Sequence, residues 1–189
     1  MKKITIALIM VISLIAPIQT MAESVTQNGT IIEPLEQNIE QIIDEITSEP
    51  RPINSDAIQN VKEYISEYFG NLGYDNIEYQ KFEYNDENNE NAIRHSSQAD
   101  VFLASTAENA IVDGIGENII VTKNSSIDTT KNLIISAHYD SAEDSVGAND
   151  NGSGVAAVLE LARILKDTEI PYNIKFILFS GEEKYMLGS

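Results

Sequence analysis

The sequence predicts an α/β fold in three layers, with a mixed, mainly parallel central sheet between helices. An apolar run at residues 133–137 is followed by a helical stretch and a second apolar run at 174–179. Two buried strands joined by a helix form a parallel crossover unit. Only three side chains are charged along residues 155–166, so the connecting helix is expected to be largely buried.

Two further helices are predicted upstream of this unit. Apolar residues recur at helical spacing over residues 34–47, which indicates an amphipathic helix. Ser55 is a suitable N-cap for the second helix. The apolar face of that helix, which we interpret as a packing face, consists of Ile58, Val61, Ile65 and Phe69.

Short strands are predicted before the crossover unit. Residues 77–84 alternate apolar and polar side chains, as a half-buried strand does, and residues 99–104 are predicted to form another strand. Residues 118–123 and 133–137 flank a loop rich in Ser, Asp and Thr. We therefore expect these two segments to pair as antiparallel strands.

The amino terminus has the pattern of a secretory signal peptide. Lys2 and Lys3 precede an apolar run over residues 4–16, and small residues lie before the expected cleavage site after Ala22. A membrane anchor is the alternative, but the run of 13 residues is shorter than the ~20 that a spanning helix needs. The predicted organisation is a signal peptide at 1–22, a flexible leader at 23–33 and a domain at 34–189. We expect a secreted protein that is free of the membrane after cleavage.

Composition restricts the partners. The chain has 30 acidic and 12 basic residues, and removal of Lys2 and Lys3 with the signal peptide changes the net charge from −18 to −20. This charge argues against nucleic acid, whose phosphates demand the opposite sign. There is no cysteine. Any bound metal must therefore be held by histidine and carboxylates, which suits zinc.

Candidate ligands follow both strands of the crossover unit. His138 and Asp140 come after the first strand, Asp150 lies at the turn into the helix, and Glu182 and Glu183 come after the second strand. Both parallel strands end at one edge of the sheet, where α/β folds bind ligands. Taken singly, each residue is as well explained by an ordinary polar surface or a helix start. Their combination at successive strand ends predicts a metal site.

These residues allow hydrolytic chemistry. His138 offers a nitrogen ligand, and Asp140 could accept a hydrogen bond from its other ring nitrogen. Asp150 could bridge two ions. Of the adjacent Glu182 and Glu183, one could bind metal while the other faces a water.

The motifs resemble those of the secreted two-zinc aminopeptidases, metallopeptidase family 28. The similar stretches are His-Tyr-Asp at 138–140, Gly-Ala-Asn-Asp-Asn-Gly-Ser-Gly at 147–154 and Phe-Ser-Gly-Glu-Glu at 179–183. The resemblance extends over about residues 118–189. It implies a hydrolase-like zinc peptidase fold, two zinc ions and peptide substrates with a free amino terminus.

The resemblance also implies a role for each residue. His138 would bind one zinc, Asp150 would bridge both and Glu183 would bind the second. Glu182 would be the general base that takes a proton from water and passes it to the leaving amine. Asp140 would orient His138.

The family uses a further Asp and a further His later in the chain. Only six residues follow Glu183, and the other imidazole, His95, lies far upstream. We therefore expect the amino-terminal part of an aminopeptidase that is at best weakly active by itself. A related zinc carboxypeptidase or deacylase is one alternative. A non-catalytic exported protein that binds a metal or a peptide is the other.

Overall fold

The computed structural model describes residues 25–27, 30–32, 34–84, 114–184 and 186–189. The chain forms two compact units, residues 1–33 and 34–189. In the first unit, β1 (Val25–Gln27) and β2 (Thr30–Ile32) pair as an antiparallel hairpin within the predicted leader. The predicted signal peptide at 1–22 and the predicted strand at 99–104 lie outside the described residues.

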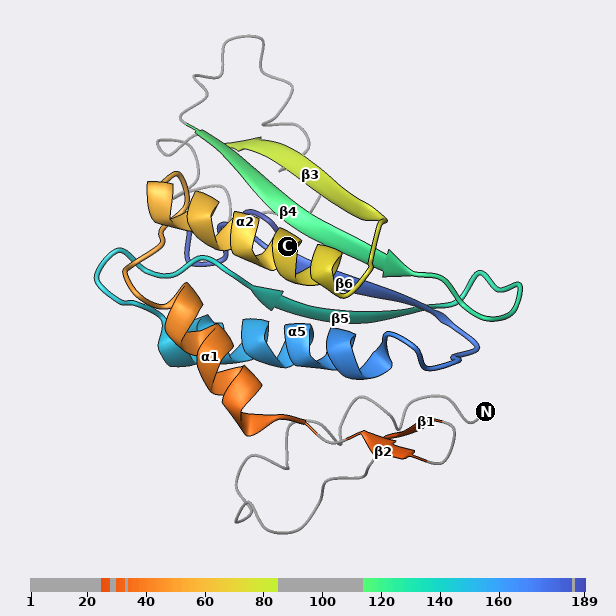
Figure 1. Ribbon diagram of the computed structural model, residues 1–189. Coiled ribbons are helices and arrows are strands. Elements are labelled where there is room, and N and C mark those ends of the chain that lie inside the picture. Colours follow the sequence, from red (N-terminus) through yellow and green to blue (C-terminus); the bar gives the residue numbers. More distant parts are fainter. Residues whose placement is uncertain (1–24, 28–29, 33, 85–113, 185) are drawn as a thin grey trace, which may run out of the picture. The chain divides into compact units, whose positions relative to one another are not determined.

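The second unit contains a four-stranded mixed sheet in the order β3-β4-β6-β5 (Figure 1). β3 pairs with β4 and β4 pairs with β6 antiparallel, whereas β5 and β6 are parallel. The strands are β3 (Ile77–Tyr84), β4 (Gly114–Lys123), β5 (Asn132–His138) and β6 (Asn173–Phe179). The predicted α/β class with a mixed sheet is confirmed. Parallel pairing is confined, among the described strands, to the crossover unit.

The predicted antiparallel pairing of 118–123 with 133–137 is wrong, because β6 lies between these strands. In the register, Val121 of β4 faces Phe176 of β6, and Phe176 faces Ile135 of β5. β6 carries apolar residues on both faces over much of its length, as a central strand does. β5 carries the exposed Ser136, which is compatible with a position at the edge of the sheet. The two strands are close in the sequence, but burial decides which strand takes the centre.

The described helices all pack on one face of the sheet. They are α1 (Glu36–Ile46), α2 (Asp56–Asn71) and α5 (Ser153–Leu165), and they share one core with β4, β5 and β6. The rings of Phe69 in α2 and Phe176 in β6 are 5.7 Å apart. On the opposite face Ile134 is 59% exposed. The part of the chain that the structure describes therefore supplies two of the three predicted layers.

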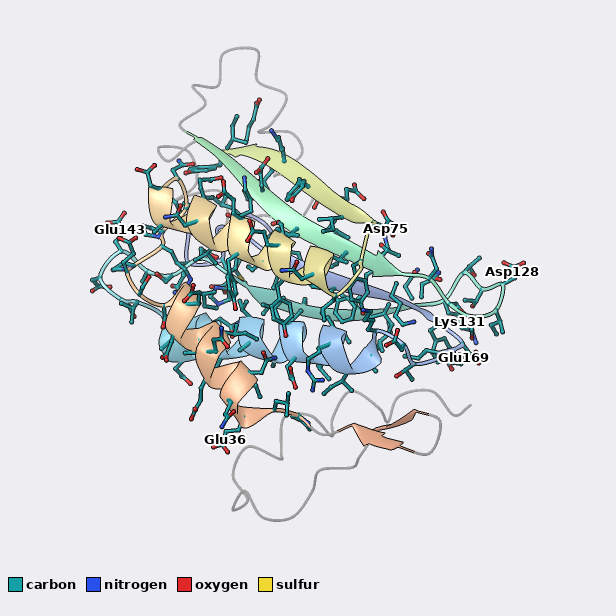
Figure 2. The ribbon with its side chains drawn as sticks, in the orientation of Figure 1. Glu36, Asp75, Asp128, Lys131, Glu143 and Glu169 are labelled. Atoms are coloured by element: carbon teal, nitrogen blue, oxygen red, sulfur yellow. The ribbon has the colours of Figure 1, made fainter. Side chains whose placement is uncertain are left out.

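Local signals for the helices agree with the sequence analysis. The Ser55 side chain accepts a hydrogen bond from the Ile58 N–H at 3.1 Å and so caps α2. The predicted apolar face of α2 is buried. By contrast, the acidic side chains Glu36, Glu143 and Glu169 lie at the outer margin of the domain (Figure 2).

One acidic side chain, Glu160 of α5, is buried and is only 3% exposed. Its carboxylate accepts hydrogen bonds from the Leu35 N–H at 2.9 Å and from Asn38 Nδ2 at 2.6 Å. It also pairs with Arg163, whose Nη2 lies 2.7 Å from Glu160 Oε1. Burial by itself raises the pKa of Glu160, but the hydrogen bonds from Arg163, Leu35 and Asn38 outweigh it and lower the pKa below 4.5. This carboxylate joins the start of α1 to α5.

We expect Glu160→Gln to lower the free energy of unfolding by about 1–3 kcal/mol near neutral pH, because charge-assisted hydrogen bonds are lost. The folded-state pKa of Glu160 is depressed, so its stabilisation is present above pH 4.5 and is lost as the pH falls through the folded-state pKa. The difference between variant and wild type should therefore shrink as the pH falls below 4.5. Urea unfolding over a series of pH values, from neutral to acidic, measures it. Glu169→Gln, which changes an exposed carboxylate, is the control, and a pH-independent difference would contradict the assignment.

Candidate metal centre

The candidate site lies at the edge where the parallel strands β5 and β6 both end. His138 is the last residue of β5 and is opposite Phe179, the last residue of β6. Glu182 and Glu183 follow after the turn through Gly181, whose φ of 74° favours glycine. A Cβ at Gly181 would also lie only 2.9 Å from Ile53 Cδ1. The turn can thus bring both glutamates back toward the histidine.

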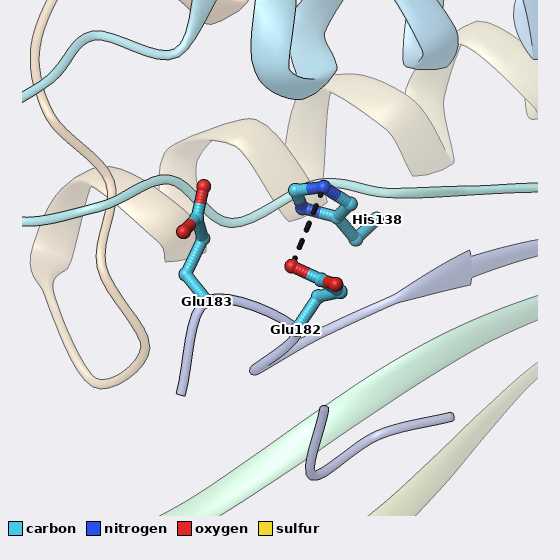
Figure 3. Close-up of side chains that lie close together, drawn as sticks. All are labelled: His138, Glu182 and Glu183. Carbon is cyan, nitrogen blue, oxygen red and sulfur yellow. Dashed lines mark ion pairs between the residues drawn. The ribbon is translucent and has the colours of Figure 1, made fainter. Parts of the chain in front are cut away.

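His138, Glu182 and Glu183 form a compact group (Figure 3). Each offers a ligand atom, and these three atoms all lie within 4.8 Å of one another. His138 Nε2 is 3.7 Å from Glu182 Oε2 and 3.0 Å from Asp150 Oδ1. Asp150 reaches the histidine from the turn Ala148–Gly152 before α5, where the peptide bond to Asn151 is cis. The residues that the sequence singled out are therefore neighbours in space, while their individual roles stay predictions.

Asp140 makes contacts that were not predicted, besides its approach to His138. Its carboxylate is 1% exposed and accepts hydrogen bonds from the Glu182 N–H at 3.2 Å and the Glu183 N–H at 3.1 Å. Its Oδ1 lies 3.4 Å from His138 Nδ1, which is within ion-pair reach, but His138 Nδ1 has no hydrogen-bond partner. In this geometry Asp140 holds the Glu182–Glu183 turn directly and acts on His138 through charge.

Asn118 of β4 also fixes this turn, and the sequence analysis did not find it. It is buried, and its Oδ1 accepts a hydrogen bond from the Ser180 N–H at 3.0 Å. Its Nδ2 donates to the Gly188 carbonyl at 2.7 Å and to Gln80 Oε1 at 3.1 Å. The only signal in the sequence is a polar residue directly before the apolar residues 119–121.

Four carboxylates surround one imidazole, which makes the site strongly anionic. Burial lowers the pKa of His138, but Asp140, Glu182 and Asp150 outweigh this effect and raise the pKa to about 9. The pKa of Glu183 is raised by burial and by the like charges of Asp150, Glu182 and Asp140, against the opposing effect of His138. A bound divalent cation would relieve this repulsion.

The donor set fits zinc. It combines an imidazole nitrogen with carboxylate oxygens, both of which zinc accepts. The buried His138 Nδ1 without a hydrogen-bond partner leaves a polar atom that a small adjustment toward Asp140 would satisfy, as in carboxylate–histidine–zinc arrangements. Next to Asp140 and Glu183, a hollow of about 300 Å³ is bordered by Ile53, Glu143 and Lys184. The hollow therefore borders one of the candidate ligands, Glu183.

Fold and site together define a class: an α/β protein with a candidate histidine–carboxylate metal site at the carboxyl edge of a parallel strand pair. Residues 118–189 match the model of Peptidase family M28. All of the candidate ligands lie within this matched segment.

Curated relatives agree with this family. The chain is 43% identical over 81 residues to aminopeptidase YwaD of Bacillus subtilis, covering 42% of this chain and 18% of that protein. It is 31% identical over 147 residues to a vacuolar membrane protease of Schizosaccharomyces japonicus, covering 78% of this chain and 16% of that protein. The chain thus spans less than a fifth of the length of these relatives.

Solved structures share the fold. The zinc aminopeptidase BSAP of Bacillus subtilis superposes with a TM-score of 0.64 at 17% identity, covering 82% of this chain and 63% of that chain. Glutaminyl cyclase of Porphyromonas gingivalis gives a TM-score of 0.59 at 18% identity, covering 81% and 48%. Because one fold carries both activities, the likeness in structure does not choose between them.

We expect Asp140→Asn to weaken zinc binding by about 10–100-fold. The amide oxygen of Asn can accept a hydrogen bond from one of the two backbone N–H groups. The NH₂ group is itself a donor and faces the other N–H, so the Glu182–Glu183 turn should be held less firmly. Competition with a chelator of known zinc affinity measures the change. Asp144→Asn, in an exposed part of the same loop, is the matched control, and wild-type affinity in Asp140→Asn would refute this role.

Proposed function

We propose that this chain belongs to a secreted aminopeptidase that uses two zinc ions to release amino-terminal residues from peptides. The observation that carries the proposal is the meeting of His138, Asp150, Glu182 and Glu183 at one sheet edge within the M28 segment. The names of similar proteins, aminopeptidase YwaD and the zinc aminopeptidase BSAP, support the same activity.

His138, Asp150 and Glu183 would hold the zinc, with Asp150 shared between the two ions. Zinc supplies Lewis-acid chemistry, which polarises a peptide carbonyl and favours deprotonation of water. Glu182 is the proposed general base, and its side chain is 38% exposed, so water can reach it. It takes a proton from the attacking water and delivers it to the leaving amine. Asp140 keeps Glu182 in place through the Glu182 N–H.

Charge around the site favours substrates with a free amino terminus. The adjacent hollow is lined by Asp140, Glu143 and Glu183, against Lys184. Two bound zinc ions would offset the charge of the ligating Glu183, so the acids left to attract a cationic α-amino group and to repel an α-carboxylate are Asp140 and Glu143. An amino-acid arylamide should therefore be cleaved, and the same arylamide with a blocked amine should not.

Export is part of the proposal and rests on residues 1–22. In the described part of the chain no helix has the length and apolar character needed to cross a bilayer. Sequencing the amino terminus of protein recovered from the medium tests the export step. A mature chain that starts at Glu23 is the expected result, and an intact Met1 would contradict cleavage.

We expect Glu182→Gln to lower kcat by about 100–10,000-fold, because the amide cannot accept the proton from water. Zinc content and KM for an amino-acid arylamide should stay close to wild type, since the backbone contacts of residue 182 remain. Steady-state kinetics measure kcat and KM, and metal analysis measures the zinc content, for variant and wild-type enzyme that are both produced in the native source. Asp144→Asn, which changes an exposed carboxylate that does not line the hollow, is the control.

Three outcomes of this experiment would count against the proposal. Full activity in Glu182→Gln would place the base elsewhere. Loss of zinc together with activity would make Glu182 a ligand instead. Zinc bound by the wild type without any hydrolysis of the arylamide would favour a non-catalytic metal-binding protein.

A further inference from the structure

Arg51 lies in the connection between α1 and α2 and is completely buried. Its Nε donates to the Tyr139 carbonyl at 2.7 Å, and Nη2 donates to the Gly147 carbonyl at 3.1 Å. Nη1 donates to the Val146 carbonyl. Within the described residues no carboxylate oxygen forms an ion pair with this guanidinium. A buried arginine is costly unless its donors are used, and here three backbone carbonyls use them.

All three carbonyls come from the loop that carries candidate zinc ligands at both ends. Tyr139 follows His138 directly, and Gly147 precedes Asp150 by three residues. The guanidinium is a rigid planar fork, so it fixes the distance between the two ends of this loop. The separation of His138 and Asp150 depends on that distance.

Backbone contacts hold the same two segments together. The Arg51 N–H donates to Ser141 Oγ at 2.9 Å, and the Ser141 N–H donates to the Arg51 carbonyl at 3.3 Å. Gly147 has a φ of 57°, and a Cβ there would lie 2.5 Å from the Asp150 carbonyl oxygen. The loop is thus closely packed around the guanidinium, with little room to rearrange.

The charge of Arg51 also acts on the site. Burial lowers the pKa of Arg51, and the negative charges of Asp140 and Glu183 oppose that change. Arginine remains protonated in proteins. The guanidinium is therefore a permanent buried cation behind an anionic site, which a neutral side chain cannot replace.

We propose that Arg51 is a positioning residue: it fixes the loop of residues 139–147 so that His138 and Asp150 are held at the spacing that zinc binding requires. This inference rests on the proposed zinc function of the site. Arg51 touches neither substrate nor metal in this role, and it acts through the two ligands.

The test compares Arg51→Lys with wild type. Lysine keeps the charge but is a single point donor, so it cannot hold three carbonyls. We expect zinc affinity, measured by chelator competition on the purified chain, to fall by about 10–100-fold. The visible spectrum of the cobalt-substituted protein should change as well, because it reports the arrangement of the ligands. Ser141→Ala removes the acceptor of the Arg51 N–H and the hydroxyl contacts to the Ala142 and Ser145 carbonyls, but it keeps the guanidinium. It should shift both readouts in the same direction by less.

A control separates positioning from general stability. Tyr74→Phe removes a buried hydrogen bond to the Ala162 carbonyl in the core, away from the candidate ligands. Circular dichroism at the assay temperature establishes that each variant is folded. The proposal requires that Tyr74→Phe leaves zinc affinity and the cobalt spectrum unchanged, whatever its loss of Tm.

Two results for the variants would overturn the inference. One is wild-type zinc affinity and cobalt spectrum in Arg51→Lys. The other is an equal loss of affinity in Tyr74→Phe, which would make Arg51 only a stabilising residue. A wild-type chain that binds no zinc contradicts both this inference and the proposed function. Zinc binding without peptide hydrolysis contradicts only the aminopeptidase proposal. The comparison of Arg51→Lys with wild type would then still test the positioning role of Arg51.

Discussion

The parallel pairing of β5 with β6 is the constraint on which the rest of the structure depends. It places His138 opposite Phe179, so the residues that follow each strand emerge at the same edge of the sheet. The crossover helix α5 begins near this edge, which brings Asp150 to the histidine. Three segments that are distant in the sequence meet there because one β-α-β connection has this geometry. An antiparallel arrangement of β5 and β6 would put Glu182 and Glu183 at the opposite end of β5.

Such a concentration of carboxylates is unfavourable without compensation. The structure provides it through buried hydrogen bonds, some of which come from residues outside the crossover unit. Asp140 accepts hydrogen bonds from two backbone N–H groups, and Asn118 accepts one from the Ser180 N–H. Arg51 donates hydrogen bonds to carbonyls of the loop between β5 and α5. A rigid scaffold of this kind keeps the ligands close together even though their charges repel. The anionic site is then prepared for a divalent cation, and the acidic hollow beside it is suited to a cationic amine.

Much of the fold could be predicted from local patterns. The bounds of β3 and the Ser55 cap of α2 agree with the structure, because alternation and capping depend on neighbouring residues. The pairing of strands could not be read in this way. β4 and β5 are consecutive in the described chain, yet β6 separates them, and the choice depends on which strand buries both faces. The burial of Glu160 could not be predicted from local patterns either. Its spacing from the other charged residues of the helix suggests a charged stripe, whereas in the folded domain Leu35 and Asn38 donate hydrogen bonds to its carboxylate.

The sequence by itself determined the α/β class, the crossover unit and the candidate ligands, because these have periodic or motif signals along the chain. Tertiary structure decided which strands are neighbours and which residues support the site. Arg51, Asn118 and the second role of Asp140 have no periodic or motif signal in the sequence, since each depends on hydrogen bonds to backbone groups that are distant along the chain. Only folding brings such donors and acceptors together, and burial then makes their hydrogen bonds obligatory.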